Sequence, residues 1–117
     1  MVAEAGGSFK INAWQWKPIV EIAGRAGIVD DETLERMNYN ADAPVTAAQA
    51  DLLAAAIDEV VATMVDDSRR MLDGRVTSEP DDGRLHREDL TLNYSIPRAR
   101  LQELAAFCRA SRGFVVS

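Results

Sequence analysis

The chain has 117 residues, of which 47% are hydrophobic, 27% charged and 6% aromatic, a length and composition that fit one globular domain. The formal net charge of −6 disfavours contact with phosphate, which argues against nucleic acid and against an anionic membrane surface as partners. No apolar stretch approaches the length of about 18 residues that a membrane span needs, and the first residues lack the features of a signal peptide. We therefore expect a cytoplasmic protein without a membrane span.

Short strands are expected near the two ends of the chain. Residues 1–8 are expected to form a flexible tail, so that the single domain covers residues 9–117. Phe9–Ile11 alternates apolar and polar residues, and Gly113–Val116 is the only other β-branched run of this kind. We expect these two segments to pair in a small two-stranded sheet that joins the termini. Because such a pair is marginal alone, a helix should pack on it.

Two helices are expected in the first third of the chain. Apolar residues recur at helical spacing on one face of Trp14–Gly27, with charged residues opposite. Proline is tolerated in the first turn but not deep inside a helix, so Pro18 predicts that this helix begins between Trp14 and Lys17. Gly27 suits the C-cap. Asp30–Met37 is predicted to be a second, short helix with an acidic first turn.

The central helix is expected to run from Thr46 to about Leu72. Thr46 and Gln49 match a capping box, in which the threonine side chain and the glutamine three residues later satisfy each other's backbone amides. Apolar residues line one side of this segment and aspartates the other. The pattern allows a break near residues 66–68.

The C-terminal half combines a polar segment with a last helix. Residues 73–93 contain few apolar side chains and three interpretations stay open: a mobile loop, a partial strand at residues 89–93, or a functional loop. The last helix is expected to begin near Pro97 and to end at about Ser111. Together these elements predict an α+β fold that is predominantly helical, with three to four packed helices and the small sheet.

Three segments together resemble a group of small uncharacterised bacterial proteins. They are Phe9-Lys10-Ile11-Asn12-Ala13-Trp14, residues 40–46, and Phe107-Cys108-Arg109-Ala110-Ser111-Arg112-Gly113-Phe114. The resemblance implies a strand followed by a tryptophan-bearing helix, a long alanine–leucine helix, and a Phe-Cys-Arg helix before a Gly-Phe strand. Arg112 stands where a second glycine is expected, so the terminal turn should differ. The resemblance bears on the fold and implies no activity.

The residue types that usually carry catalysis or metal binding are scarce in this chain. Cys108 is the only thiol and His86 the only imidazole. Cys108 lies on the apolar face of the last helix, where cysteine behaves as a small buried hydrophobe, and His86 lies in the polar segment. Zinc sites need several cysteine or histidine ligands, and this chain has one of each. The pairs of acidic residues at 66–67 and 81–82 could face a cation but lack the residue pattern of a calcium-binding loop. We therefore expect no metal or cofactor, and the absence of nucleotide-binding and hydrolase motifs makes an enzyme the less favoured hypothesis.

Four residues are candidates for a binding surface. Trp14 projects away from the apolar face of its helix, and an exposed tryptophan is a typical interface anchor. Arg98, Arg109 and Arg112 share the face of the last helix opposite its apolar side, and residues 96–117 carry four arginines and one glutamate on an otherwise acidic chain. These arginines could bind an acidic partner or a phosphate, or they could face the acidic side of the central helix. Trp14 could instead cover the start of its helix or pack under the terminal strand.

Two functional hypotheses follow from these features. The first is a small protein-binding or regulatory module that contacts a protein partner or associates with itself, because the chain lacks a catalytic constellation. The alternative is a small enzyme or ligand-binding protein that uses the polar segment at residues 79–93. That alternative predicts a pocket lined by His86 and by acids such as Asp82 or Glu88.

Overall fold

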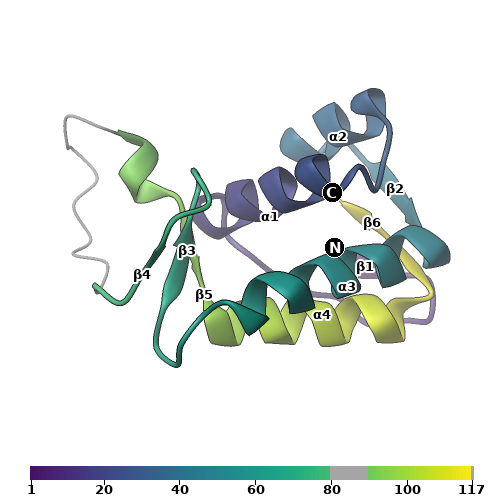
Figure 1. Cartoon of the computed structure of the whole chain (residues 1–117). Coiled ribbons are helices and arrows are strands. Elements are labelled where there is room, and N and C mark those ends of the chain that lie inside the picture. Colours follow the sequence, from purple (N-terminus) through teal and green to yellow (C-terminus); the bar gives the residue numbers. More distant parts are fainter. Residues whose placement is uncertain (80–89, 117) are drawn as a thin grey trace.

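The computed structural model describes residues 1–79 and 90–116, and these residues form an α+β fold, as predicted (Figure 1). Four α-helices and two small antiparallel sheets are present in this part of the chain. In chain order the elements are β1 (Val2–Ala3), α1 (Ala13–Ala26), α2 (Asp31–Asn38), β2 (Ala43–Thr46), α3 (Ala47–Ala62), β3 (Arg69–Met71), β4 (Val76–Thr77), a 3-10 helix (Leu90–Asn93), β5 (Ser95–Pro97), α4 (Arg98–Ser111) and β6 (Gly113–Val116).

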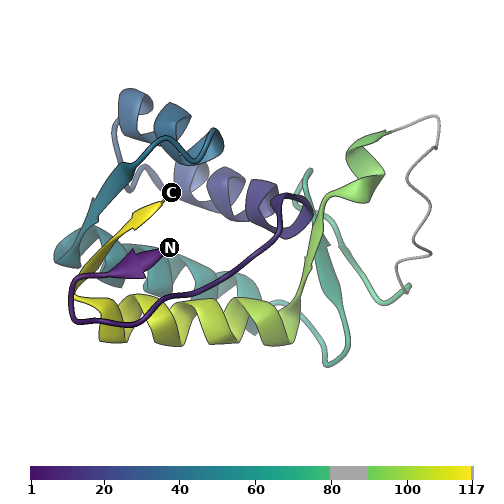
Figure 2. The same ribbon diagram turned by 180° about the vertical axis from the view of Figure 1, so that it is seen from behind.

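The first sheet joins the termini, but its composition differs from the prediction. It has three strands in the order β1-β6-β2, all antiparallel, so the strand at the end of the chain lies in the middle (Figure 2). The strand expected at Gly113–Val116 is confirmed as β6. Its N-terminal partner is β1 and not Phe9–Ile11, and the second partner, β2, was missed because its four residues include Pro44, which is unfavourable within strands.

The reason for the shifted N-terminal strand is a tight turn inside the segment that was expected to be a tail. Gly6 and Gly7 have φ angles of +95° and +87°, which only glycine adopts readily, and they let Ser8 bridge back to Val2. The chain then runs along α4 (Figure 2), and the ring centre of Phe9 lies 5.5 Å from that of Phe107. The alternation that suggests a strand at Phe9–Ile11 therefore reflects packing on a helix.

Helix α1 begins one residue before the predicted range. Asn12 is the N-cap, and its side chain accepts a hydrogen bond of 2.9 Å from the amide of Gln15. Pro18 consequently lies in the second turn and is buried, which corrects the expectation that it stays in the first turn. The C-cap is Gly27, as predicted, with a left-handed φ of 64°. The short helix α2 has Asp30 as its N-cap and ends at Asn38, close to its predicted bounds.

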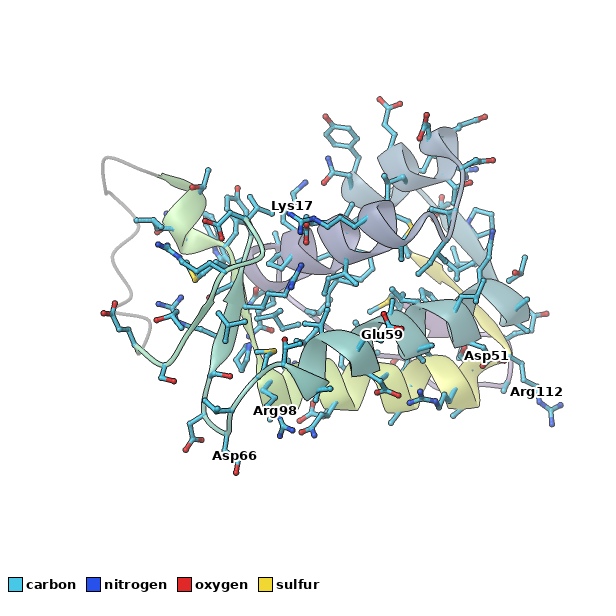
Figure 3. All side chains as sticks on the ribbon, viewed as in Figure 1. Lys17, Asp51, Glu59, Asp66, Arg98 and Arg112 are labelled. Atoms are coloured by element: carbon cyan, nitrogen blue, oxygen red, sulfur yellow. The ribbon has the colours of Figure 1, made fainter. Side chains whose placement is uncertain are left out.

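Helix α3 begins where the capping box predicts and ends ten residues earlier than expected. Both hydrogen bonds of the capping box between Thr46 and Gln49 are present. After Ala62 the backbone turns, and Asp67 adopts a left-handed φ of 61°, so that the chain enters β3 (Figure 3). The apolar spacing in the sequence continues past the end of α3 because Met71 fits the helical pattern. In the structure Met71 is a buried residue of strand β3.

The second sheet has the order β4-β3-β5. Of its strands only β4 lies within residues 73–93, the segment for which three interpretations stayed open. Residues 90–93 form the 3-10 helix, so the strand considered there is not found. Residue 89 of that alternative lies outside the described residues. Strand β5 leads directly into α4, for which Pro97 is the N-cap.

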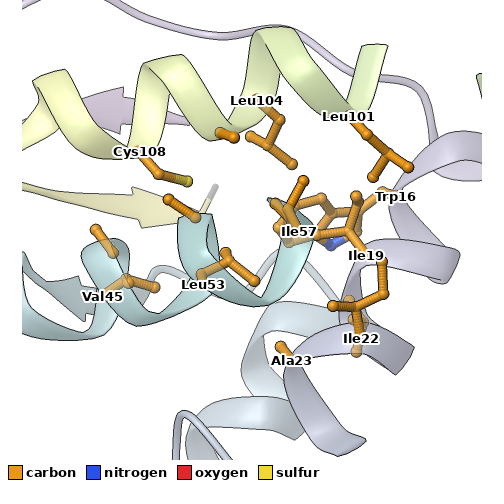
Figure 4. Close-up of a cluster of buried hydrophobic side chains, with 14 of the residues drawn as sticks. Trp16, Ile19, Ile22, Ala23, Val45, Leu53, Ile57, Leu101, Leu104 and Cys108 are labelled. Atoms are coloured by element: carbon orange, nitrogen blue, oxygen red, sulfur yellow. The ribbon is translucent and has the colours of Figure 1, made fainter. Parts of the chain in front are cut away.

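The core lies where α1, α3 and α4 meet the inner face of the first sheet (Figure 4). Leu53 and Ile57 of α3 face Leu101 and Leu104 of α4, and all four are at most 1% exposed. Cys108 is 1% exposed among them, as the sequence predicts. The two amphipathic helices therefore do pack through their apolar sides.

Candidate functional site

An open groove of about 870 Å³ lies over one face of α1. Its two walls are α2 and, on the other side, Leu72 and Tyr94, which flank β3 and β5. Figure 1 shows α2 and these strands at different sides of α1. We call this feature the α1 groove. Its lining residues are Lys17, Val20, Glu21, Gly24, Arg25, Asp31, Leu34, Glu35, Asn38, Tyr39, Leu72 and Tyr94.

The wall formed by α2 is held on α1 by side-chain hydrogen bonds and by one close packing contact. The indole Nε1 of Trp16 donates a buried hydrogen bond of 2.8 Å to the carbonyl oxygen of Met37. Lys17 Nζ donates to the backbone and side-chain oxygens of Asn38 at 2.9 and 2.6 Å. At the other end, a Cβ on Gly24 would lie 3.1 Å from a methyl carbon of Leu34, so glycine permits the close approach of the two helices. These contacts preform this side of the groove.

Aromatic side chains stand at the borders of the α1 groove. Trp14 is 40% exposed, and its ring centre lies 4.9 Å from that of Tyr94, which lines the groove. On the opposite wall Tyr39 is 71% exposed, and Lys17 Nζ lies 5.5 Å from its ring centre. Trp14 is therefore both partly exposed and packed on Tyr94. Its neighbour could not be inferred from the sequence, because residues 14 and 94 are far apart along the chain.

A network of ionic contacts connects α1 to the second sheet at one side of the groove. Glu21 pairs with Arg25 on the same helix, and its other carboxylate oxygen lies 3.1 Å from Arg70 Nη2 on β3. The side chains of Glu21 and Arg70 are only 18% and 11% exposed. Removing one partner would leave a poorly solvated charge, so this network fixes the position of β3 relative to α1.

The three arginines predicted as a binding ridge do not form one free surface. Arg98 Nη1 lies 3.1 Å from Asp66, and Arg109 pairs with Asp58 of α3. The interpretation in which the arginines face the acidic side of the central helix fits Arg109, whereas the partner of Arg98 lies in the turn after α3. Arg112 follows the end of α4 and projects outward, far from Arg98 (Figure 3). No contact in the structure assigns a ligand to any of them.

Arg112 carries a backbone conformation that favours glycine. Its φ angle is 56°, the left-handed region in which an L-residue costs about 1 to 2 kcal/mol. We therefore expect Arg112→Gly to raise the free energy of unfolding by about 1 kcal/mol, measured by urea denaturation. Arg112→Ala, which removes the same charge without changing the backbone preference, is the control. Equal effects of the two substitutions would show that charge and not backbone conformation decides the stability here.

The thiol of Cys108 is buried, and we expect it to be unreactive in the native protein. Desolvation by burial raises the pKa of Cys108 to about 12, and the nearby Arg109 only partly opposes this shift. Because the thiolate is the reactive form, we expect native protein to react with a disulfide reagent at neutral pH far more slowly than protein in denaturant. The release of thionitrobenzoate over time measures both rates. Rapid labelling of the native protein would contradict the packing of α4 on α3.

The polar-segment alternative falls mostly outside the described residues. His86, Asp82 and Glu88 all belong to residues 80–89. Within residues 1–79 and 90–116, no three histidine, cysteine or acidic side chains are grouped so that they could hold a metal ion. Among the helices of the described residues, none combines the length and apolar character that crossing a bilayer requires.

Comparison of the chain with protein-family models, with curated proteins and with solved structures finds no match in any of the three.

Proposed function

We propose that this chain is a small protein-binding module and that the α1 groove is its binding surface. The observation that carries the proposal is a pair of exposed aromatic side chains: Tyr39, which lines the groove, and Trp14, which packs on the lining residue Tyr94 at the opposite border. Large aromatic rings anchor protein interfaces because they bury much apolar surface while losing little conformational freedom. Elsewhere among the described residues, the exposed large apolar side chains are aliphatic.

The lining of the α1 groove supports a polypeptide as the occupant. Val20 of α1, Leu34 of α2 and Leu72, which directly follows β3, supply the apolar lining, and charged side chains surround them. An apolar strip between charged borders matches an amphipathic helix, which lays one apolar face into a groove and keeps its polar side chains at the edges. Hydrogen bonds from Trp16 and Lys17 already hold the α2 wall, so binding would not require ordering of this wall.

The experiment is a selection of random peptides of roughly 15 residues, enough for about four helical turns, on the immobilised protein. We expect enriched peptides to bind the wild-type chain, and we expect Tyr39→Ser and Trp14→Ser each to weaken this binding roughly tenfold or more. Fluorescence anisotropy of labelled peptides measures the dissociation constants.

Leu52→Ser is the matched control for these substitutions. Leu52 is 57% exposed but lies on α3 and does not line the groove, so its loss should leave peptide binding unchanged. Circular dichroism of each variant verifies that the helices are retained. Failure to enrich any peptide, or binding that all three substitutions leave untouched, would refute the proposed function.

A further inference from the structure

The charged side chains that line the α1 groove differ in whether they have partners within the protein. Both cations that line it have hydrogen-bond or ionic partners within the protein: Lys17 donates two hydrogen bonds to the neutral Asn38, and Arg25 pairs with Glu21. Glu21 is also held by Arg70. The remaining two acids are Asp31 and Glu35 of α2, and within the described residues neither has an ion-pair partner.

Asp31 and Glu35 form one patch of negative charge on the α2 wall. Asp31 and Glu35 are four residues apart on one helix, so they lie one above the other and their like charges repel. Leu34, which also lines the groove, lies beside them on the same helix. One wall of the groove therefore offers two exposed carboxylates, without an ion-pair partner among the described residues, next to an apolar surface.

Building on the proposed function, we propose that the partner is a basic amphipathic polypeptide segment, which places a lysine or arginine against Asp31 and Glu35 while an apolar neighbour packs on Leu34 and Val20. A cation there relieves the repulsion between the two carboxylates, and an arginine can donate to a carboxylate through two nitrogens. The net charge of −6 also accelerates the encounter with a positively charged segment.

The test uses the peptides enriched on the wild-type protein and measures their dissociation constants for two variants of equal charge. Asp31→Asn/Glu35→Gln removes the two carboxylates of the α2 wall. Asp51→Asn/Glu59→Gln removes two exposed carboxylates of α3, which do not line the α1 groove (Figure 3). A general attraction between an acidic protein and a basic peptide would weaken equally in both variants.

We expect lysine and arginine to be enriched in the selected peptides over the starting library. The α2 variant should bind them roughly three- to tenfold more weakly than the wild-type protein, while the α3 variant binds as the wild type does. Replacing the basic residue of a peptide by glutamine should cause a similar loss against the wild type and little further loss against the α2 variant.

Three other outcomes are informative and separable. Peptides that require Trp14 and Tyr39 but bind the α2 variant as tightly as the wild type would overturn the basic-partner inference and leave the groove as the binding surface. Equal losses in the α2 and α3 variants would overturn the inference as well, because they indicate attraction without a specific site. If no peptide depends on Trp14 or Tyr39, the proposed function and this inference both fail.

Discussion

Leu53→Ala is expected to lower the free energy of unfolding by about 3 to 5 kcal/mol. Leu53 is 1% exposed and lies in the core between α3 and α4 (Figure 4). Its truncation removes apolar contacts and leaves a cavity that two packed helices cannot close, so both costs apply. Because a domain of this size has a total stability of about 5 to 15 kcal/mol, the loss would be a large fraction of it. Urea denaturation followed by circular dichroism measures the change.

The neighbouring Leu52 supplies the control. It has the same side chain on the same helix but is 57% exposed, so Leu52→Ala should change the stability by less than about 0.5 kcal/mol. The contrast between these two adjacent leucines tests which side of α3 faces the core, in addition to testing that this segment is helical. Similar losses for the two variants would mean that α3 faces the core with a different side.

Gly113→Ala is expected to destabilise the protein by about 3 kcal/mol or more, because two costs combine. The φ angle of Gly113 is +102°, a region that L-residues rarely adopt. An added Cβ would also lie 2.8 Å from the carbonyl oxygen of Val45 and 3.2 Å from the amide nitrogen of Ala47. These are backbone atoms at the junction of β2 and α3, so they cannot move aside as a flexible side chain would.

Gly27→Ala separates these two costs. Gly27 also has a positive φ, of 64°, but an added Cβ would meet no atom within 4 Å. Its replacement should therefore cost only about 1 kcal/mol, the conformational part alone. Thermal or urea unfolding of both variants gives the comparison. If Gly113→Ala proved no more harmful than Gly27→Ala, the close contact between β6 and the start of α3 would be wrong.

Local signals in the sequence located the beginnings of helices well. Thr46 acts as an N-cap where its side chain predicts it, because a capping hydrogen bond involves only residues within about one turn. Helix α2 begins within one residue of its expected start, although Asp30 is its N-cap and not its first helical residue. The burial of Cys108 followed from its position on the apolar face of α4, since helical periodicity is also a local property. Gly27 ends α1 for the same kind of reason.

The errors arose where a local pattern had two physical explanations. Apolar periodicity continued through Met71, although a strand buries this residue, and the alternation at Phe9–Ile11 reflects contact with α4. The arginines of α4 share a helix face, but only the packing of α3 beside that helix shows that Arg109 meets Asp58. A charge on a helix face does not reveal whether solvent, a partner or another helix lies opposite.

By itself the sequence determined the class of the fold, the starts of three of its helices and the apolar sides through which α3 and α4 pack. The tertiary structure alone decided which strands pair with β6 and which residues form the α1 groove. The α1 groove is lined by residues between 17 and 39 and by residues 72 and 94, which are distant along the chain. Such a surface depends on the relative placement of whole elements, whereas caps and periodicity depend only on neighbouring residues. Trp14 was a candidate from the sequence, but its place beside a groove required the fold.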